Sequence, residues 1–358
     1  MDFREEFTAN HTNHHELFVR GFSFARCGFS LFALLLIFSF FSCTKAESSR
    51  AELALGTVCS VTLFEDGKDS VYNDIFSRIR EIENLMSVNI PTSDISRINN
   101  NSGIAPVKVH EDTFKVIKRA LFFAKASGGA FDPTVGPLVT LWGISGDNPC
   151  VPSQSEINET LALINWRFVL LDDNEQSVFL THRAMALDLG SIAKGFAADE
   201  AAKIIKREKV ARAKIDLGGN IIMLGARKDR RPWRVGIQNP GESRGSVIGV
   251  LQVPEKTIVT SGVYERYFEE NGVHYHHLFS PSLGYPAQNG LLSVTVVTDV
   301  SMDADALSTA AFVLGYDKGA DLLRSFANVQ AIFVFDDKSV RITDGMDFTI
   351  TDKLYYIE

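Results

Sequence analysis

The segment DADALSTAAFVLG, residues 303–315, places two carboxylates and a threonine in a stretch that otherwise resembles a buried helix. If the helix begins near Ala304, Asp305 and Thr309 are four residues apart and share one face. Their oxygens suit a hard cation such as Mg²⁺, and no Cys or His stands nearby to favour zinc. In the alternative interpretation, Asp303 caps the helix and Thr309 is an ordinary interior residue. The segment by itself leaves both interpretations open.

A second candidate site is ALDLGSIAKGFAADEAAK, residues 186–203, where a strand is expected to pass through a Gly-Ser turn into a helix. The first turn of that helix carries Lys194, and exposed N–H groups at a helix start bind phosphate well beside a lysine. Ser191 in the turn offers a further hard oxygen to a metal. The GxxxxGK[ST] pattern of a P-loop is missing, and GxGxxG occurs nowhere in the chain. An ordinary helix start with a solvated lysine is the alternative.

Three histidines follow a predicted hairpin turn at Asn271-Gly272 in YERYFEENGVHYHHLFSPSLGYP. Strand alternation places His274 and His276 on one face and His277 on the other. The pattern therefore predicts an exposed pair and one inward-facing imidazole. His277 could transfer a proton or hold a phosphate there, and a hydrogen-bonded core histidine is the alternative.

Hydrophobic periodicity predicts the elements that must position these residues. The predicted helices are 70–86 (with Asp69 or Ser70 as N-cap), 111–127, 154–164, 192–208, a segment from about 304 to 315, and 317–326. The predicted strands are 57–64, 168–171, 184–190, 213–217, 220–225, 234–238, 247–253, 256–262, 264–270, 274–279, 291–300 and 331–336. Residues 129–143 are expected to form a loop. Antiparallel strands with interspersed helices favour an α+β fold, with mixed, largely antiparallel sheets and packed helices, over a doubly wound one.

Composition limits the class of protein. The chain has 358 residues, 45% of them hydrophobic and 22% charged, which is typical of a globular protein. A formal net charge of -8 argues against nucleic acid as a partner, because nucleic-acid binding needs a basic face. Cys59 and Cys150 have no spacing that suggests a disulfide framework, so we expect a core and a loop cysteine.

The N-terminal segment GFSLFALLLIFSFFSC, residues 28–43, is uncharged, preceded by arginines and followed by Lys45. It has the length of a signal-peptide core and is short for a membrane span of roughly 20 residues. Cys43 after a small serine forms a loose lipobox. We therefore expect a leader and lipoprotein signal peptide over 1–43, lipid on Cys43, and a single catalytic domain over 44–358 on the periplasmic side of the inner membrane. A plain signal peptide or an uncleaved anchor is the alternative.

Eight segments of the chain match motifs of a known protein family and follow one another in the same order. They are LGT at 55–57, LMSVNIPTSDISRIN, GGAFDPTVGPLVTLWG, LDLGSIAKGFAAD, IDLGGN, TSGVYERYF, HHLFSP-x-x-GYP and DADALSTAAFVLG. Together, over roughly residues 50 to 345, they resemble the FAD:protein FMN transferase family of bacterial lipoproteins and exported enzymes. The resemblance implies an α+β fold that binds FAD and Mg²⁺. It also implies transfer of FMN to a threonine or serine hydroxyl of an acceptor protein in a membrane or periplasmic redox system, with release of AMP.

The resemblance also assigns roles to single residues, carried over by motif. The implied metal ligands are Ser191, Asp305 and Thr309. The implied FAD contacts are Leu55, Ala130, Phe131, Asp132, Asp188, Lys194, His277 and Phe279. A pyrophosphate repels nucleophiles, so a metal and a lysine or helix end are needed to neutralise its charge. The acceptor hydroxyl then needs a base, and the sequence leaves Asp303 and His277 as equal candidates.

Asn89, within LMSVNIP, is a departure from the family, which often has an aromatic residue at this position. An aromatic ring could pack on the flavin or adenine and hold the dinucleotide, so Asn89 should loosen retention and admit water. This predicts an additional activity, hydrolysis of FAD to FMN and AMP. A rival prediction of a different class is a lipoprotein that binds and stores FAD without chemistry.

Overall fold

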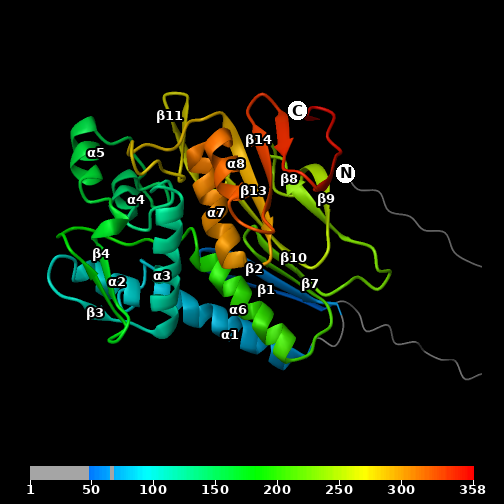
Figure 1. Cartoon of the computed structure of the whole chain (residues 1–358), viewed down its shortest axis with the longest axis horizontal. Helices are drawn as coiled ribbons and strands as arrows, with labels where there is room; N and C mark the ends of the chain where they lie inside the picture. Colours follow the sequence, from blue (N-terminus) through cyan, green and yellow to red (C-terminus); the bar gives the residue numbers. More distant parts are fainter. Residues whose placement is uncertain (1–47, 65–67) are drawn as a thin grey trace, which may run out of the picture. The chain divides into compact units, whose positions relative to one another are not determined.

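The computed structural model describes residues 48–64 and 68–358. The predicted lipidation site Cys43 and the segment 28–43 lie outside these ranges. In the described part, a nine-stranded sheet has helices packed on one face and a three-stranded sheet on the other (Figure 1). This arrangement confirms the predicted α+β fold with largely antiparallel sheets.

The elements follow one another along the chain as mixed helices and strands. The helices are α1 (Asp69–Met86), α2 (Asp94–Asn100), α3 (Glu111–Ala126), α4 (Gly136–Trp142), α5 (Gln154–Leu161), the 3-10 helix η1 (Trp166–Phe168), α6 (Ala193–Arg207), α7 (Ser301–Leu314) and α8 (Tyr316–Arg324). The strands up to β9 are β1 (Ser48–Ala54), β2 (Thr57–Leu63), β3 (Val107–Lys108), β4 (Val169–Asp172), β5 (Ser177–Leu180), β6 (Ala213–Leu217), β7 (Asn220–Leu224), β8 (Trp233–Gln238) and β9 (Val247–Val253). The remaining strands are β10 (Lys256–Gly262), β11 (Tyr267–Glu270), β12 (Val273–His276), β13 (Leu291–Thr298), β14 (Gln330–Phe335), β15 (Ser339–Ile342), β16 (Asp347–Ile350) and β17 (Tyr356–Ile357).

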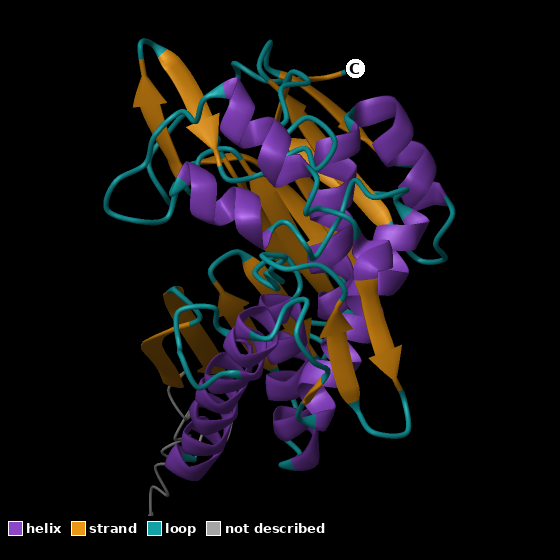
Figure 2. Cartoon of the chain, turned by 90° about the vertical axis from the view of Figure 1, so that its left-hand side faces the viewer, coloured by secondary structure: helices purple, strands orange, loops and turns teal. Residues whose placement is uncertain are grey.

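The large sheet has the strand order β1-β2-β6-β7-β10-β13-β14-β15-β17, and only the β15–β17 pair is parallel. Successive residues of a strand point to opposite faces, and the central strands are apolar on both. Thus Val259 and Val296 face the helices, whereas Ile258 and Val297 face the small sheet β16-β9-β8. Figure 2, viewed from the helical side, shows helices in front of the strands of the nine-stranded sheet.

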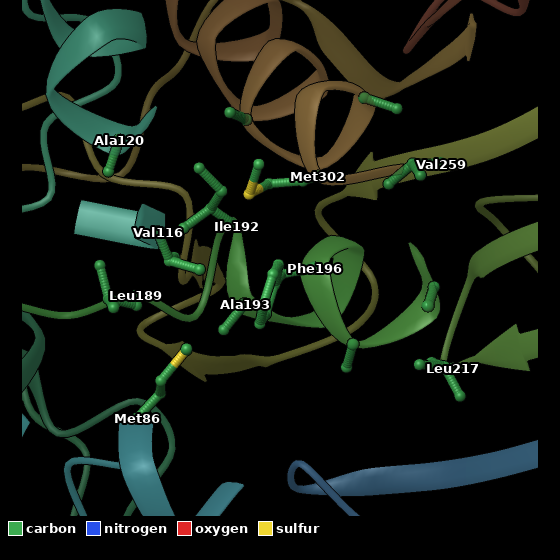
Figure 3. Close-up of a cluster of buried hydrophobic side chains, with 14 of the residues drawn as sticks. Met86, Val116, Ala120, Leu189, Ile192, Ala193, Phe196, Leu217, Val259 and Met302 are labelled. Atoms are coloured by element: carbon green, nitrogen blue, oxygen red, sulfur yellow. The ribbon is translucent and has the colours of Figure 1, made fainter. Parts of the chain in front are cut away.

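The main hydrophobic core lies between the sheet and the helices that cover it. Phe196 of α6, Met302 of α7, Val116 of α3 and Met86 at the end of α1 are all buried there, and Val259 of β10 joins them (Figure 3). Elements far apart in the sequence therefore share one core. Burial of large apolar side chains, at roughly 1.5–3 kcal/mol each, is what holds α6 and α7 against the sheet.

The N-terminal ends of α6 and α7 are capped by each other. Neither helix has a capping side chain of its own, since Ile192 and Val300 occupy the two N-cap positions. Asp199 of α6 accepts hydrogen bonds from the backbone N–H groups of Ser301 and Met302, each at 2.9 Å. In return, Oδ2 of Asp305 on α7 accepts a hydrogen bond from the backbone N–H of Gly195, the third residue of α6. Each carboxylate thus supplies acceptors to N–H groups that lack partners within their own helix.

Glycine at position 195 makes this exchange possible. A Cβ there would lie 2.3 Å from the carbonyl oxygen of Ser301, so any larger residue would force α6 and α7 apart. Burial, with a smaller contribution from the nearby Asp303 carboxylate, raises the pKa of Asp199 to about 6. The ends of the two helices are therefore held by groups that are largely withdrawn from water.

Several predicted elements differ from the structure. Residues 184–190 are not a strand: Ala184 lies in a turn with a positive φ of 65°, and the segment makes a single bridge, Val135 to Ala186. The backbone of Leu187 is bonded at both N–H and C=O by the side chain of Asn99, which takes the place of a strand partner. The expected loop at 129–143 contains α4, whose Leu138 and Trp142, four residues apart, are fully buried.

The predicted helix starts also need correction. Helix α7 begins at Ser301 instead of near Ala304, so Asp303 lies in its first turn and not at its cap. The N-cap of α1 is Lys68, without a side-chain hydrogen bond, instead of Asp69 or Ser70. The predicted core and loop cysteines are confirmed, because Cys59 is buried and unpaired and Cys150 is exposed and unpaired. Among the described residues, no helix combines the length and apolar character needed to cross a membrane.

We predict that Asp199→Ala lowers the free energy of unfolding by about 1–3 kcal/mol, because two buried N–H groups of α7 lose their acceptors. Urea unfolding followed by circular dichroism measures this change. Asp321→Ala, which removes an exposed carboxylate of α8, is the matched control and should change stability by less than about 0.5 kcal/mol. Equal stability of Asp199→Ala and the control would contradict the reciprocal cap.

Candidate active site

A cavity of about 630 Å³ opens where the starts of α6 and α7 meet the β1–β2 turn and the loops around α1, α4 and β12. The structure brings twelve of the residues singled out in the sequence into its lining. They are Leu55, Asn89, Ala130, Phe131, Asp132, Asp188, Ser191, Lys194, His277, Phe279, Asp305 and Thr309. These residues come from segments spread over 250 positions of the chain, and only the fold places them together.

Asp305 contributes a buried carboxylate to the lining of this cavity. Its Oδ2 accepts a hydrogen bond of 2.9 Å from the backbone N–H of Gly195, the second half of the reciprocal cap. Its Oδ1 lies 3.6 Å from Nζ of Lys194, which also donates to the carbonyl of Gly190 at 3.0 Å. One carboxylate oxygen therefore maintains the fold, while the other is directed to the lysine and the cavity.

Hydroxyl groups line the same cavity as this carboxylate. Thr309, one turn after Asp305 as predicted, has its Oγ1 3.3 Å from Oγ of Ser261 on β10. Ser261 is in turn 2.8 Å from Oγ of Ser308. Ser191, in the turn before α6, lines the same cavity. The cavity thus combines the Asp305 carboxylate with several hydroxyls, all hard oxygen donors.

This donor set fits a magnesium ion better than a transition metal. In the described part of the chain, no three His, Cys, Asp or Glu side chains gather in a way that could hold a metal by themselves. Mg²⁺ is usually bound by one or two carboxylates together with phosphate oxygens and water, not by a full protein cage. Asp305, Thr309 and Ser191 therefore suit a cation that arrives with a phosphorylated ligand.

His277 is half-buried at the cavity wall, with its Nδ1 3.2 Å from the carbonyl oxygen of Arg266. A carbonyl can only accept, so Nδ1 carries the proton and Nε2 keeps a free lone pair. Burial lowers the pKa of His277 to about 3, and the charges of Arg266 and Lys194 act in the same direction. The imidazole is therefore neutral at physiological pH and able to accept a proton at Nε2.

The other two histidines do not form the predicted exposed pair. His276 is buried, its Nε2 donates to the carbonyl of Ala287 at 3.0 Å, and its Nδ1 accepts from the N–H of Leu278. His274 is partly buried, with Nε2 3.1 Å from the carbonyl of Val263. Both are held by the backbone, because the face expected to meet solvent packs against the loops around β12. The predicted hairpin turn at Asn271-Gly272 is confirmed, and both residues have positive φ.

Asp303 is not brought into the cavity. Its carboxylate accepts two hydrogen bonds from the guanidinium of Arg119 on α3, at 2.8 and 2.5 Å, and it is absent from the cavity lining. The helix begins three residues earlier than expected, which turns Asp303 toward α3 while Asp305 faces α6. The interpretation of Asp303 as a base therefore has no geometric support, whereas His277 has a free acceptor atom at the site.

Two loops of the lining are held by side-chain carboxylates. Asp132 accepts from the N–H and hydroxyl of Thr134 and from the N–H of Trp166, and burial raises its pKa. Both its oxygens are thus engaged within the protein, and its main effect is to shape the Ala130–Asp132 loop. Leu55 has a positive φ of 54° in the β1–β2 turn, and its N–H donates to Glu83 at 2.7 Å.

Sequence reasoning missed several lining residues. Ser261 and Arg266 lie within TSGVYERYF, which was used only as a family signature, although a Ser in that segment offers a metal-suited oxygen. Arg244 and Glu265 form an ion pair of 3.0 Å at the cavity rim. The same pair also lines a second cavity of about 500 Å³ beside the first. Ion pairs between distant segments leave no periodic signal in a sequence.

Comparison with known proteins agrees with this geometry. The chain is 39% identical over 317 residues to a FAD:protein FMN transferase of Treponema pallidum, a match that covers 84% of this chain and 88% of the relative. It is 38% identical to a FAD:protein FMN transferase of Klebsiella pneumoniae, with coverage of 76% and 84%.

Solved structures show the same fold. The ApbE protein of Thermotoga maritima superposes with a TM-score of 0.76 at 33% identity, over 83% of this chain and 97% of that one. The flavin transferase ApbE of Vibrio cholerae superposes with a TM-score of 0.73 at 26% identity, over 86% and 98%. The sequence model of the ApbE family matches residues 55–333, most of the described chain, and this protein therefore belongs to the ApbE family.

Proposed function

We propose that this protein is a FAD:protein FMN transferase that moves FMN from FAD to a threonine or serine hydroxyl of an acceptor protein and releases AMP. The observation that carries the proposal is the convergence of Asp305, Lys194 and His277 in one cavity with an unengaged imidazole nitrogen. A cationic side chain, a metal-suited carboxylate and a proton acceptor are the groups that attack on a pyrophosphate requires.

Magnesium dependence is part of the proposal. Ser191, Asp305 and Thr309 would hold the ion, with phosphate oxygens completing its ligands. Bound there, Mg²⁺ would supply charge neutralisation to the pyrophosphate. The chain's own cation, Lys194, is already within 3.6 Å of the same carboxylate, so it would stand beside the phosphates in any arrangement that uses Asp305.

The residues of the chain then account for the proton and the bond change. The acceptor hydroxyl oxygen forms a bond to the phosphorus of the FMN half, and the bond from that phosphorus to the bridging oxygen breaks. The bridging oxygen leaves with the bonding electrons as part of AMP. The hydroxyl proton passes to Nε2 of His277, whose Nδ1–H stays on the Arg266 carbonyl.

We also propose hydrolysis of FAD to FMN and AMP by the same site, with water in place of the acceptor hydroxyl. Asn89 lines the cavity from an exposed loop position between α1 and α2, where it offers no ring to cover a flavin or adenine. Water is smaller than any acceptor, so an open rim favours it. A storage protein without chemistry is the second candidate, and it predicts FAD recovered intact.

Export and lipid attachment remain a proposal from the sequence. The apolar run at 28–43 ends in Cys43, and the described domain begins five residues later at Ser48. The acceptor would then be a protein of the same membrane or periplasmic compartment. Metabolic labelling with radioactive palmitate tests this: label on the wild type that Cys43→Ala does not lose would reject the assignment.

The experiment for the proposed function combines the mature domain, FAD and Mg²⁺ with and without a threonine-bearing flavin-acceptor domain. AMP is followed by chromatography and covalent flavin by in-gel fluorescence. Covalent flavin on the acceptor supports the transferase, and AMP without acceptor supports the hydrolase. Intact FAD in both mixtures would leave only the storage protein.

We predict that Asp305→Asn lowers AMP formation by at least about 100-fold, because the cavity loses the carboxylate that would bind Mg²⁺. Asp303→Asn, on the same helix but paired with Arg119 outside the cavity, is the matched control and should retain activity within several-fold. AMP release at saturating Mg²⁺ measures both. A similar loss in the two variants would restore Asp303 as a candidate base.

We predict that His277 of the free protein stays neutral down to at least pH 5, because burial lowers its pKa to about 3. This shift stabilises the fold above the ordinary histidine pKa of about 6.5, and that stability is lost as the pH falls from there toward 3. Added FAD should move the pKa upward, since phosphate charge favours the imidazolium. Imidazole NMR shifts, assigned with His277→Gln and recorded without metal, measure both values; titration near pH 6.5 in the free protein would refute the burial argument.

We predict that Asn89→Tyr slows AMP release without acceptor by about tenfold or more and leaves FAD bound, because a ring at the rim can stack on the dinucleotide. Asn89→Ala is the control, since it changes the same position without adding a ring, and it should keep the wild-type rate within about twofold. Single-turnover FAD hydrolysis measures the effect. Equal rates for Tyr and Ala would show that position 89 does not govern access of water.

A further inference from the structure

The charged residues that line the main cavity are predominantly acidic. The acidic residues are Glu83, Asp132, Asp188, Glu265 and Asp305, and the basic ones are Lys194, Arg244 and Arg266. A dinucleotide brings two further negative charges on its pyrophosphate. Its binding therefore depends on cationic side chains that are free to face it.

Two of the three basic side chains already have partners. Lys194 lies 3.6 Å from the Asp305 carboxylate and donates to the Gly190 carbonyl. Arg244 pairs with Glu265 at 3.0 Å. Within residues 48–64 and 68–358, the guanidinium of Arg266 forms no ion pair or hydrogen bond, although its backbone is firmly held. Among the basic side chains that line the cavity, Arg266 is thus the one whose N–H donors remain available to a ligand in the described part of the chain.

The backbone of Arg266 is tied to the proposed base. Its carbonyl oxygen accepts from the backbone N–H of His277 at 3.1 Å and faces Nδ1 of the same imidazole at 3.2 Å. The positive charge of Arg266 also contributes to the lowered pKa of His277. The backbone of Arg266 and the imidazole of His277 therefore belong to one hydrogen-bonded unit of the cavity wall.

The guanidinium of Arg266 extends toward the β1–β2 turn. Its Nη2 lies 3.2 Å from the position that a Cβ would take on Gly56, in the β1–β2 turn. Gly56 has a positive φ of 67°, so the turn itself favours glycine, and the missing side chain leaves room for the arginine. The side chain therefore spans from the His277 loop to the β1–β2 turn.

We propose that Arg266 is a phosphate-binding residue of this site that grips the pyrophosphate of FAD beside His277. A planar guanidinium presents paired donors that match two phosphate oxygens, which a lysine cannot reproduce. The inference rests on the proposed function in taking FAD as the ligand. It adds a residue that selects for the phosphates of the dinucleotide and aligns them with the atom that receives the proton.

The test compares ligands that carry the pyrophosphate with one that does not. Wild type, Arg266→Met, Arg266→Lys and the control Arg324→Met, which removes an exposed arginine of α8, are titrated in EDTA, so that no substrate is consumed. FAD and riboflavin binding is followed by flavin fluorescence, and ADP binding, which presents a pyrophosphate without a flavin, by calorimetry. Circular dichroism melting verifies that each variant is folded.

Arg266→Met should weaken FAD and ADP binding by about 10- to 100-fold, the loss expected for hydrogen bonds to a charged group. Riboflavin binding should change by less than about twofold. Arg266→Lys should recover only part of the loss, and Arg324→Met should stay near wild type because Arg324 is paired with Asp321 on α8 and does not line the cavity. FAD and ADP affinities of Arg266→Met within twofold of wild type would overturn the inference, as would an equal loss for riboflavin.

The same titrations separate this inference from the proposed function. Wild-type protein that binds ADP but not FAD would reject FAD as substrate, while the ADP affinities would still decide the role of Arg266. Wild-type protein that binds neither ligand would reject both. FAD binding that Arg266→Met leaves unchanged would reject only the role of Arg266.

Discussion

The reciprocal capping of α6 and α7 is the interaction on which the site depends. Asp199 of one helix supplies acceptors to the start of the other, and Asp305 does the same in return. Gly195 allows the approach because it has no Cβ to meet Ser301. The exchange fixes the two helix ends against each other within a shared core, where apolar packing alone would permit small sliding motions.

This arrangement also determines the chemistry that the cavity can offer. A helix start carries partial positive charge, which stabilises the two carboxylates, and Oδ1 of Asp305 remains directed at Lys194. The same residue is therefore a structural acceptor and a candidate metal ligand. Because Asp305 is buried and bonded at Oδ2, its remaining oxygen has little freedom to reorient, which is the preorganisation that charge stabilisation requires.

A second rigid unit faces the helix ends. The segment from Arg266 to His277 folds as the β11–β12 hairpin, and its two ends are joined by the bonds between the Arg266 carbonyl and His277. Its far side packs on the cluster around Trp142, whose Nε1 donates to the Gly284 carbonyl. The proposed base and the proposed phosphate-binding arginine thus share one scaffold, and the proposed metal ligands share another. Relative placement of the two scaffolds would govern the distance between proton acceptor and phosphate.

The amino-acid sequence by itself was enough to predict the α+β class, the i, i+4 pairing of Asp305 and Thr309, and the hairpin turn at Asn271-Gly272. Each of these follows from local periodicity or from the backbone preferences of single residues, which a sequence displays directly. The family motifs likewise marked the residues that line the cavity. Tertiary structure alone decided the rest. It extended α7 to Ser301 by a cap from another helix, turned Asp303 to Arg119, and replaced a predicted strand at 184–190 by bonds to Asn99. Among the residues that the structure describes, it also left the Arg266 guanidinium in the cavity lining without a charged partner. These outcomes depend on contacts between segments far apart in the chain, and such contacts have no local pattern from which they could be predicted.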